Sequence, residues 1–89
     1  MKRNEITVSG DVQGVFYRHH ALKKAKILKV KGWIRNEVNG EISMVVEGND
    51  DALKNFVDWV WEGSPMSDVA DVEIEEKEAT GEFEEFRII

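Results

Sequence analysis

The spacing of apolar residues changes period several times along this chain of 89 residues, and this succession constrains the fold more than any other feature. Residues 6 to 8 alternate apolar and polar side chains, which indicates a strand. From Tyr17 to about Lys29 the apolar residues take helical spacing and share one helix face. They are Ala21, Leu22, Ala25 and Leu28. Residues 30 to 37 are strand-like again, so the chain begins with a strand, a helix and a strand.

A tight turn follows the second strand. Asn39-Gly40 is a strong hairpin signal, because both residue types tolerate a positive φ. Residues 41 to 47 supply the partner strand.

A second helix is expected from Asn49, which is a good N-cap residue. Gly63 suits the position just past the helix end, and Pro65 blocks its continuation. Trp59 and Trp61 lie about 200° apart on this helix, so we expect one to pack and the other to be partly exposed. The apolar stripe recurs at i, i+3, i+4 and i+7. It consists of Leu53, Phe56, Val57 and Val60.

Residues 72 to 77 alternate in an acid-rich stretch that predicts a fourth strand, and residues 83 to 89 can form a short last strand. The order is β-α-β-β-α-β with an additional terminal strand. We therefore predict an α+β, ferredoxin-like sandwich (βαββαβ), in which an antiparallel sheet carries two helices on one face. One domain should cover residues 1–89. This fold hosts many functions and does not decide the activity.

Composition narrows the possible functions. The chain has no cysteine, which excludes disulfides, thiolate metal sites and a thiol nucleophile. Its net charge of −6 argues against general nucleic-acid binding. No apolar run approaches the roughly 18 residues that span a membrane, and no signal peptide is evident. We expect a cytoplasmic protein with no nucleic-acid or membrane partner, most simply a monomer.

The segment from Gly10 to Arg18 joins the first strand to the first helix, and it has the features of an anion site. Glycines at positions 10 and 14 let the backbone curl so that several N–H groups converge. The N-terminus of the following helix attracts anions. Arg18 adds a planar guanidinium cation that can bind a phosphate through two hydrogen bonds.

An ordinary strand-to-helix turn with a solvated arginine is the alternative interpretation of the same residues. The segment lacks the Gly-Lys-Ser/Thr ending of a nucleotide-binding P-loop, and it is not a dinucleotide fingerprint. Spacing alone leaves both interpretations open.

Two blocks of sequence resemble the acylphosphatase family. Val12-Gln13-Gly14-Val15-Phe16-Tyr17-Arg18 is similar to the family signature, a Val-Gln-Gly-Val run followed by two positions and arginine. Gly32-Trp33-Ile34-Arg35-Asn36 looks like the second family block, Gly-Trp-x-x-Asn. Asn39-Gly40, Glu47-Gly48 and Gly63-Ser64-Pro65 are similar to later landmarks, so the resemblance covers nearly the whole chain.

The resemblance implies an enzyme that hydrolyses the carboxyl–phosphate bond of small acyl phosphates, with no metal and no cofactor. It implies that Arg18 and Asn36 are the catalytic residues, and that Asn36 orients the attacking water. The phosphate is expected to bind to Arg18 and to the amides of the loop. The expected phosphate-binding residues are Gln13, Gly14, Val15, Phe16, Tyr17 and Arg18. One departure is Asp11, at a position that is often basic in such sequences; we expect its carboxylate to point to solvent.

Two functions compete with the enzyme: a non-catalytic phosphate-binding module that uses the same loop, and a nucleic-acid-binding domain of the same fold. The second needs a basic sheet and aromatic residues on the central strands, and the sequence predicts neither. Asn36 alone could also be a strand-end cap. His19 and His20 lie about 100° apart on a helix, so they cannot both face one substrate, and we expect them on the helix surface.

Overall fold

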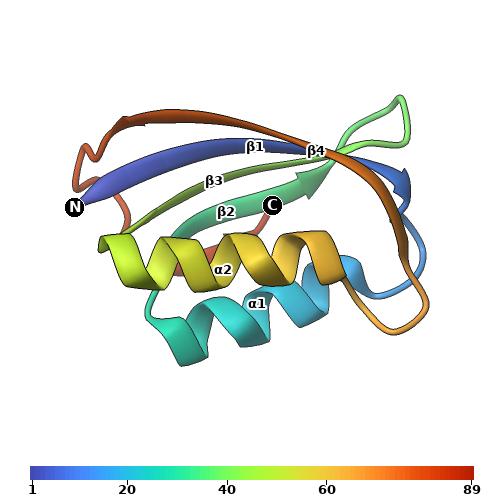
Figure 1. Cartoon of the computed structure of the whole chain (residues 1–89), viewed down its shortest axis with the longest axis horizontal. Helices are drawn as coiled ribbons and strands as arrows, with labels where there is room; N and C mark the ends of the chain where they lie inside the picture. Colours follow the sequence, from blue (N-terminus) through green and yellow to red (C-terminus); the bar gives the residue numbers. More distant parts are fainter.

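The computed structural model describes all residues from 1 to 89 and contains seven elements (Figure 1). In chain order they are β1 (Lys2–Asp11), α1 (Tyr17–Leu28), β2 (Lys31–Asn36), β3 (Ile42–Gly48), α2 (Asp50–Glu62), β4 (Asp68–Glu78) and β5 (Phe86–Ile88). All seven were expected from the sequence, with bounds that differ by a few residues.

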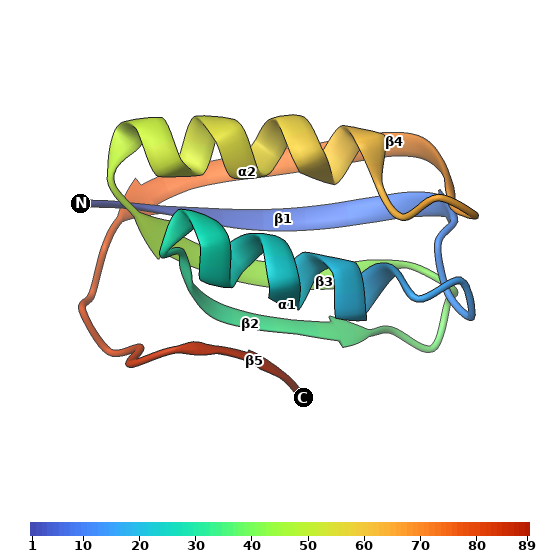
Figure 2. The ribbon, with the colours of Figure 1, turned by 90° about the horizontal axis from the view of Figure 1, so that it is seen from below.

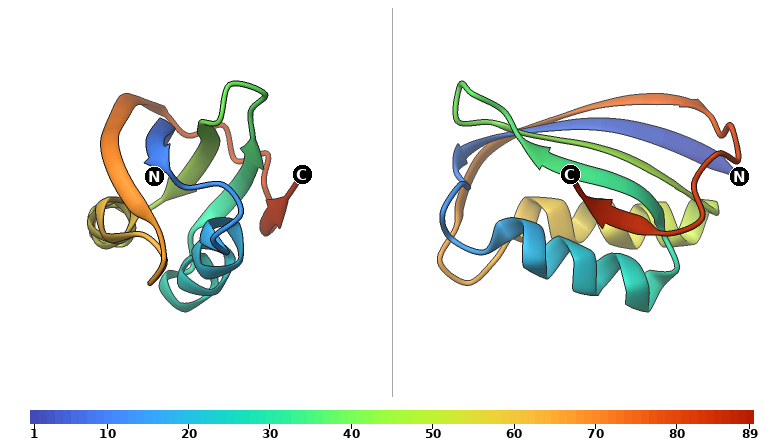
Figure 3. Two further views of the ribbon diagram at one scale, coloured as in Figure 1. Left: turned by 90° about the vertical axis from the view of Figure 1, so that its right-hand side faces the viewer. Right: turned by 180° about the vertical axis from the view of Figure 1, so that it is seen from behind.

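The strands form a single sheet in the order β4-β1-β3-β2-β5. The first four strands pair antiparallel throughout. The short β5 pairs parallel to β2 at the sheet edge and makes the sheet mixed (Figure 2). Both helices pack on the same face of the sheet (Figures 1 and 3). The ferredoxin-like sandwich predicted from the sequence is therefore confirmed.

The core lies between the sheet and the helix pair, and every element contributes buried apolar side chains to it. Tyr17 of α1, Phe56 of α2 and Ile34 of β2 are among its largest fully buried members. Neither helix is both long enough and apolar enough to span a membrane.

The ends of α2 follow the sequence expectations. Asn49 is the N-cap, and its side-chain oxygen accepts a hydrogen bond from the Ala52 amide at 2.8 Å. Gly63 ends the helix with φ at 74°, a conformation that glycine adopts without strain. Trp59 is buried and Trp61 is 49% exposed, as the angle between them predicts.

Gly10 plays a different role from the expected one. It does not begin the anion loop, because β1 continues to Asp11 and pairs Gly10 with Val69 after a bulge. With φ at 123°, Gly10 passes so close to β4 that an added Cβ would lie 2.3 Å from the Asp68 carbonyl oxygen. The close approach of two strands requires this glycine, and the loop is shortened to residues 12 to 16.

The connection from β4 to β5 must cross from one edge of the sheet to the other, and Glu47 holds it in place. The Glu47 side chain is almost fully buried, which is unusual for a carboxylate. It accepts hydrogen bonds from the Thr80 amide at 2.9 Å, the Gly81 amide at 3.1 Å and the Arg3 guanidinium at 3.3 Å. Burial would raise the pKa of Glu47, but these hydrogen bonds outweigh burial and lower that pKa.

Candidate active site

The loop between β1 and α1 presents unpaired amides. Val12 is buried in the core and anchors the start of the loop. Gly14 and Phe16 then adopt φ values of 76° and 63°, which turn the chain sharply. The backbone N–H groups of residues 12 to 16 donate to no acceptor in the protein. Successive free amides in a tight turn form an anion-binding concavity.

The N-terminus of α1 is uncapped and adds positive partial charge next to this concavity. Phe16 is the N-cap residue and its side chain makes no capping hydrogen bond, and no acidic residue lies in the first turn. The first backbone bond at the helix start runs from the His20 amide to the Phe16 carbonyl at 3.1 Å. The positive end of the α1 dipole therefore points at the loop without compensation from the protein.

Arg18 is the one arginine of the chain without an acidic partner. Arg3, Arg35 and Arg87 each form an ion pair with a glutamate at 3.3 Å or less. Arg18 is half-buried in the first turn of α1 and forms no ion pair. Its guanidinium is available to bind an anion held by the loop.

Asn36 lies at the end of β2, on the sheet face that Ile34 shares, because side chains two residues apart on a strand point the same way. That face carries the helices, so the Asn36 side chain points toward the α1 side of the sheet. Its Oδ1 atom is buried and has no hydrogen-bond partner, and it is the only buried side-chain oxygen or nitrogen in this state. An orphaned buried acceptor is rare in folded proteins and marks a site where a ligand or water can donate to it.

The side chain of Gln13 connects the loop to the β2–β3 hairpin. Its Nε2 donates to the carbonyl oxygens of Glu37 at 2.8 Å and of Glu41 at 2.9 Å. Glu37 directly follows Asn36 in the chain. Gln13 therefore brings the loop and Asn36, which are more than 20 residues apart in sequence, to one place.

Two further hydrogen bonds hold the loop against α2 and the turn after it. The buried Ser64 hydroxyl donates to the Val15 carbonyl at 2.7 Å, and the Tyr17 hydroxyl donates to the Val60 carbonyl at 2.8 Å. The β1–α1 loop, the β2–β3 hairpin and the α2–β4 turn all lie at one end of the molecule (Figure 3). The loop is thus fixed on both sides.

The predicted phosphate-binding residues differ in the groups that they can offer to an anion. Gln13, Gly14, Val15 and Phe16 offer free amides. The Tyr17 ring is buried, with its centroid 5.0 Å from that of Trp59, so this residue can offer only its backbone amide. Burial also raises the pKa of the Tyr17 hydroxyl, which keeps it protonated.

The neighbouring polar residues lie where the sequence analysis expected them. Asp11 and His19 are exposed, and His20 Nδ1 lies 3.0 Å from the Phe16 carbonyl oxygen. Sequence reasoning missed the anchoring roles of the Gln13 and Ser64 side chains. The only signal for either was its position inside a family-like block.

The fold and the loop define a class of protein: a small ferredoxin-like domain with a turn of unpaired amides between its first strand and first helix. The family model described as Acylphosphatase matches residues 4–88. The chain therefore belongs to the acylphosphatase family.

Curated relatives and solved structures agree with this assignment. The chain is 41% identical over 86 residues to an acylphosphatase of Pelotomaculum thermopropionicum, an alignment that covers 97% of this chain and 94% of the relative. It is 38% identical to an acylphosphatase of Methylococcus capsulatus, covering 100% and 97% of the two chains. The crystal structure of acylphosphatase from Bacillus subtilis superposes with a TM-score of 0.97 at 35% identity, covering 100% of this chain and 99% of the other.

Proposed function

We propose that this protein hydrolyses small acyl phosphates to a carboxylate and inorganic phosphate. The observation that carries the proposal is the orphaned Oδ1 of Asn36 beside a loop of unpaired amides. Family membership and the names of the relatives support it. The loop amides and Arg18 supply hydrogen-bond donors and positive charge for a phosphoryl group, and Asn36 supplies a hydrogen-bond acceptor for a water molecule.

In the proposed reaction the loop amides and Arg18 bind the three non-bridging oxygens of the phosphoryl group. Catalysis of phosphoryl transfer requires mainly that the protein position the reactants and stabilise the charge on these oxygens. Donors that are fixed before the reaction stabilise that charge without reorganising. The anchors at Gln13 and Ser64 hold the loop in its reactive shape.

Asn36 accepts a hydrogen bond from the attacking water and orients it toward phosphorus. The water oxygen forms a bond to phosphorus while the bond from phosphorus to the acyl oxygen breaks, and the carboxylate leaves with the bonding electron pair. An amide is a poor base, so a water proton passes to a non-bridging phosphate oxygen. The products are one carboxylate and one dihydrogen phosphate ion, which balances the charge of the dianionic substrate. All the groups named belong to one chain, so a monomer suffices.

Hydrolysis of benzoyl phosphate by the purified protein, with a chelator present, tests the proposal. We expect turnover well above the uncatalysed rate and competitive inhibition by inorganic phosphate. Phosphate binding without turnover would contradict the enzyme and indicate a phosphate-binding module.

A further inference from the structure

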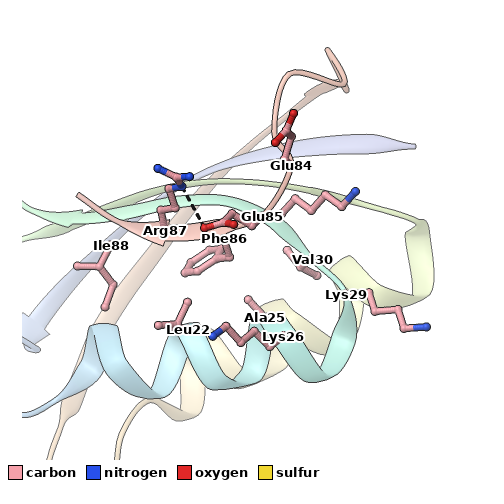
Figure 4. Close-up of a pocket in the computed structure, with 11 residues that line it drawn as sticks. Leu22, Ala25, Lys26, Lys29, Val30, Glu84, Glu85, Phe86, Arg87 and Ile88 are labelled. Carbon is pink, nitrogen blue, oxygen red and sulfur yellow. Dashed lines mark hydrogen bonds and ion pairs between the residues drawn. The ribbon is translucent and has the colours of Figure 1, made fainter.

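A groove of about 650 Å³ runs between α1 and β5 (Figure 4). Leu22 and Ala25 line it from the helix, and Phe86 and Ile88 line it from the strand. Figure 4 shows the side chains of Leu22 and Ile88 pointing toward one another across it. None of the residues that line it belongs to the anion loop or to the proposed catalytic pair.

One end of the groove lies next to the proposed phosphate site. Leu22 follows Arg18 by four residues in α1, so both side chains lie on one stripe of the helix. On the opposite wall, Ile88 is in register with Ile34 in the parallel β2–β5 ladder, two residues before Asn36. The apolar groove therefore begins about one helical turn from Arg18 and leads away from the loop along α1.

The rim of the groove is positively charged although the chain is acidic overall. Lys26, Lys29 and Lys31 lie along it, opposed by Glu84. The other two charges, on Glu85 and Arg87, neutralise each other in an ion pair at 3.1 Å. A positive rim along a groove that leads to the phosphate site raises the local concentration of an anionic substrate.

We propose that this groove receives the acyl group of the substrate and gives the enzyme a preference for extended apolar acyl chains. The inference rests on the proposed function. With the phosphoryl group in the loop, the bends at the bridging oxygen and the carbonyl carbon allow the chain to turn along α1. The helix rises about 10 Å from Leu22 to Lys29 at 1.5 Å per residue, a length comparable to that of an octanoyl chain.

The comparison of octanoyl phosphate with acetyl phosphate isolates this contribution, because the two carboxylate leaving groups have nearly equal basicity. Complete burial of one methylene group is worth about fourfold in an equilibrium constant. A groove open on one side gives about half of that free energy, or roughly twofold for each methylene. For the longer chain we expect kcat/KM to be higher by a factor on the order of 50.

The variant Leu22→Gln places a polar group in the groove, and Ile27→Gln makes the same change on the exposed side of α1. We expect Leu22→Gln to lower the ratio of the two kcat/KM values at least about fivefold, and Ile27→Gln to leave it unchanged. Ile88→Gln repeats the test from the strand wall, in case Leu22→Gln unfolds. Octanoate should also inhibit acetyl phosphate hydrolysis more strongly than acetate does.

Acetyl phosphate hydrolysis with no preference for the octanoyl substrate would overturn the inference and leave the proposed function intact. Equal effects of Leu22→Gln and Ile27→Gln on the ratio would overturn it as well. Failure to hydrolyse either substrate would overturn the proposed function itself.

Discussion

The carboxamide nitrogen of Gln13 lies 2.8 Å from the carbonyl oxygen of Glu37, and this hydrogen bond joins the anion loop to the residue directly after Asn36. A second bond, to the Glu41 carbonyl, secures the same side chain. The two halves of the proposed site come from separate elements, α1 with its loop and β2. Gln13 is the residue that fixes the distance between them, and we regard it as a positioning residue.

Gln13→Ala removes this link. We expect kcat for benzoyl phosphate to fall about tenfold while KM changes less than about threefold, because misplaced water affects the chemical step more than binding. Steady-state kinetics measure both. Asn39→Ala is the matched control, since Asn39 hydrogen-bonds to Glu41 within the same hairpin but does not touch the loop. Equal kcat values for the wild type and Gln13→Ala would contradict the positioning role.

Ser64→Ala removes the hydrogen bond to the Val15 carbonyl on the other side of the loop. We expect about 1–3 kcal/mol of lost stability, since a polar group loses its partner, and a severalfold weaker inhibition by phosphate. Urea unfolding and inhibition constants measure the two effects. Ser67→Ala tests the assignment, because its hydroxyl donates to the Ser64 carbonyl and not to the loop. Equal loss of phosphate affinity in both variants would contradict a specific role for Ser64.

Tyr17→Phe removes the Tyr17 hydroxyl and leaves the ring and the backbone amide in place. The hydroxyl donates to the Val60 carbonyl and the ring is buried, so we expect a loss of about 1 kcal/mol of stability. Because the hydroxyl is bonded to Val60 in the core and only the backbone amide is free, kcat should stay within about twofold of the wild type. A large loss of activity in a folded Tyr17→Phe protein would show that the hydroxyl takes part in the reaction.

Glu47→Gln tests the buried carboxylate under the β4–β5 connection. Its pKa is lowered in the folded protein, so the charged form stabilises the fold above the unfolded pKa of about 4.5 and this contribution disappears as the pH falls through the folded pKa. We expect the variant to lose about 2 kcal/mol near pH 7 and to approach the wild type once the pH lies below the lowered pKa of Glu47 in the folded protein. Urea unfolding across this range measures the difference.

Glu82→Gln is the control for that experiment. Glu82 also pairs with Arg3, at 2.8 Å, but its side chain is more than half exposed, so the loss should be at most about 1 kcal/mol. A difference between wild type and Glu47→Gln that does not change with pH would contradict the account of the carboxylate.

The parts of the fold that depend on local sequence could be predicted, and those that depend on distant contacts could not. The Asn49 cap and the Gly63 helix end follow from residue types at adjacent positions. The turn at Asn39-Gly40 was also expected, but only Gly40 has a positive φ, at 91°, and Asn39 does not. The partners of Gln13 are main-chain atoms 24 and 28 residues away, and no pattern in the sequence records them. The same holds for Glu47, whose partners Thr80 and Gly81 lie 33 and 34 residues away.

Gly10 belongs to the segment singled out from the sequence, but the structure gives a different reason for a glycine at this position. Its place in a glycine-bounded segment indicated that it lets the backbone curl so that the loop amides converge. The structure shows instead that β4 leaves no room for a side chain there. The pairing of β1 with β4 therefore requires a glycine at position 10, and a single sequence does not show which strands pair.

The most direct test of the proposed site is the kinetic comparison of Asn36→Ala with the wild type on benzoyl phosphate. Because Asn36 Oδ1 has no partner in the protein, its removal should leave the free energy of unfolding unchanged or raise it by up to about 1 kcal/mol. We predict that kcat falls at least about tenfold while the inhibition constant of phosphate stays within about twofold. A folded Asn36→Ala protein that turns over benzoyl phosphate at the wild-type rate would contradict the claim that Asn36 orients the attacking water.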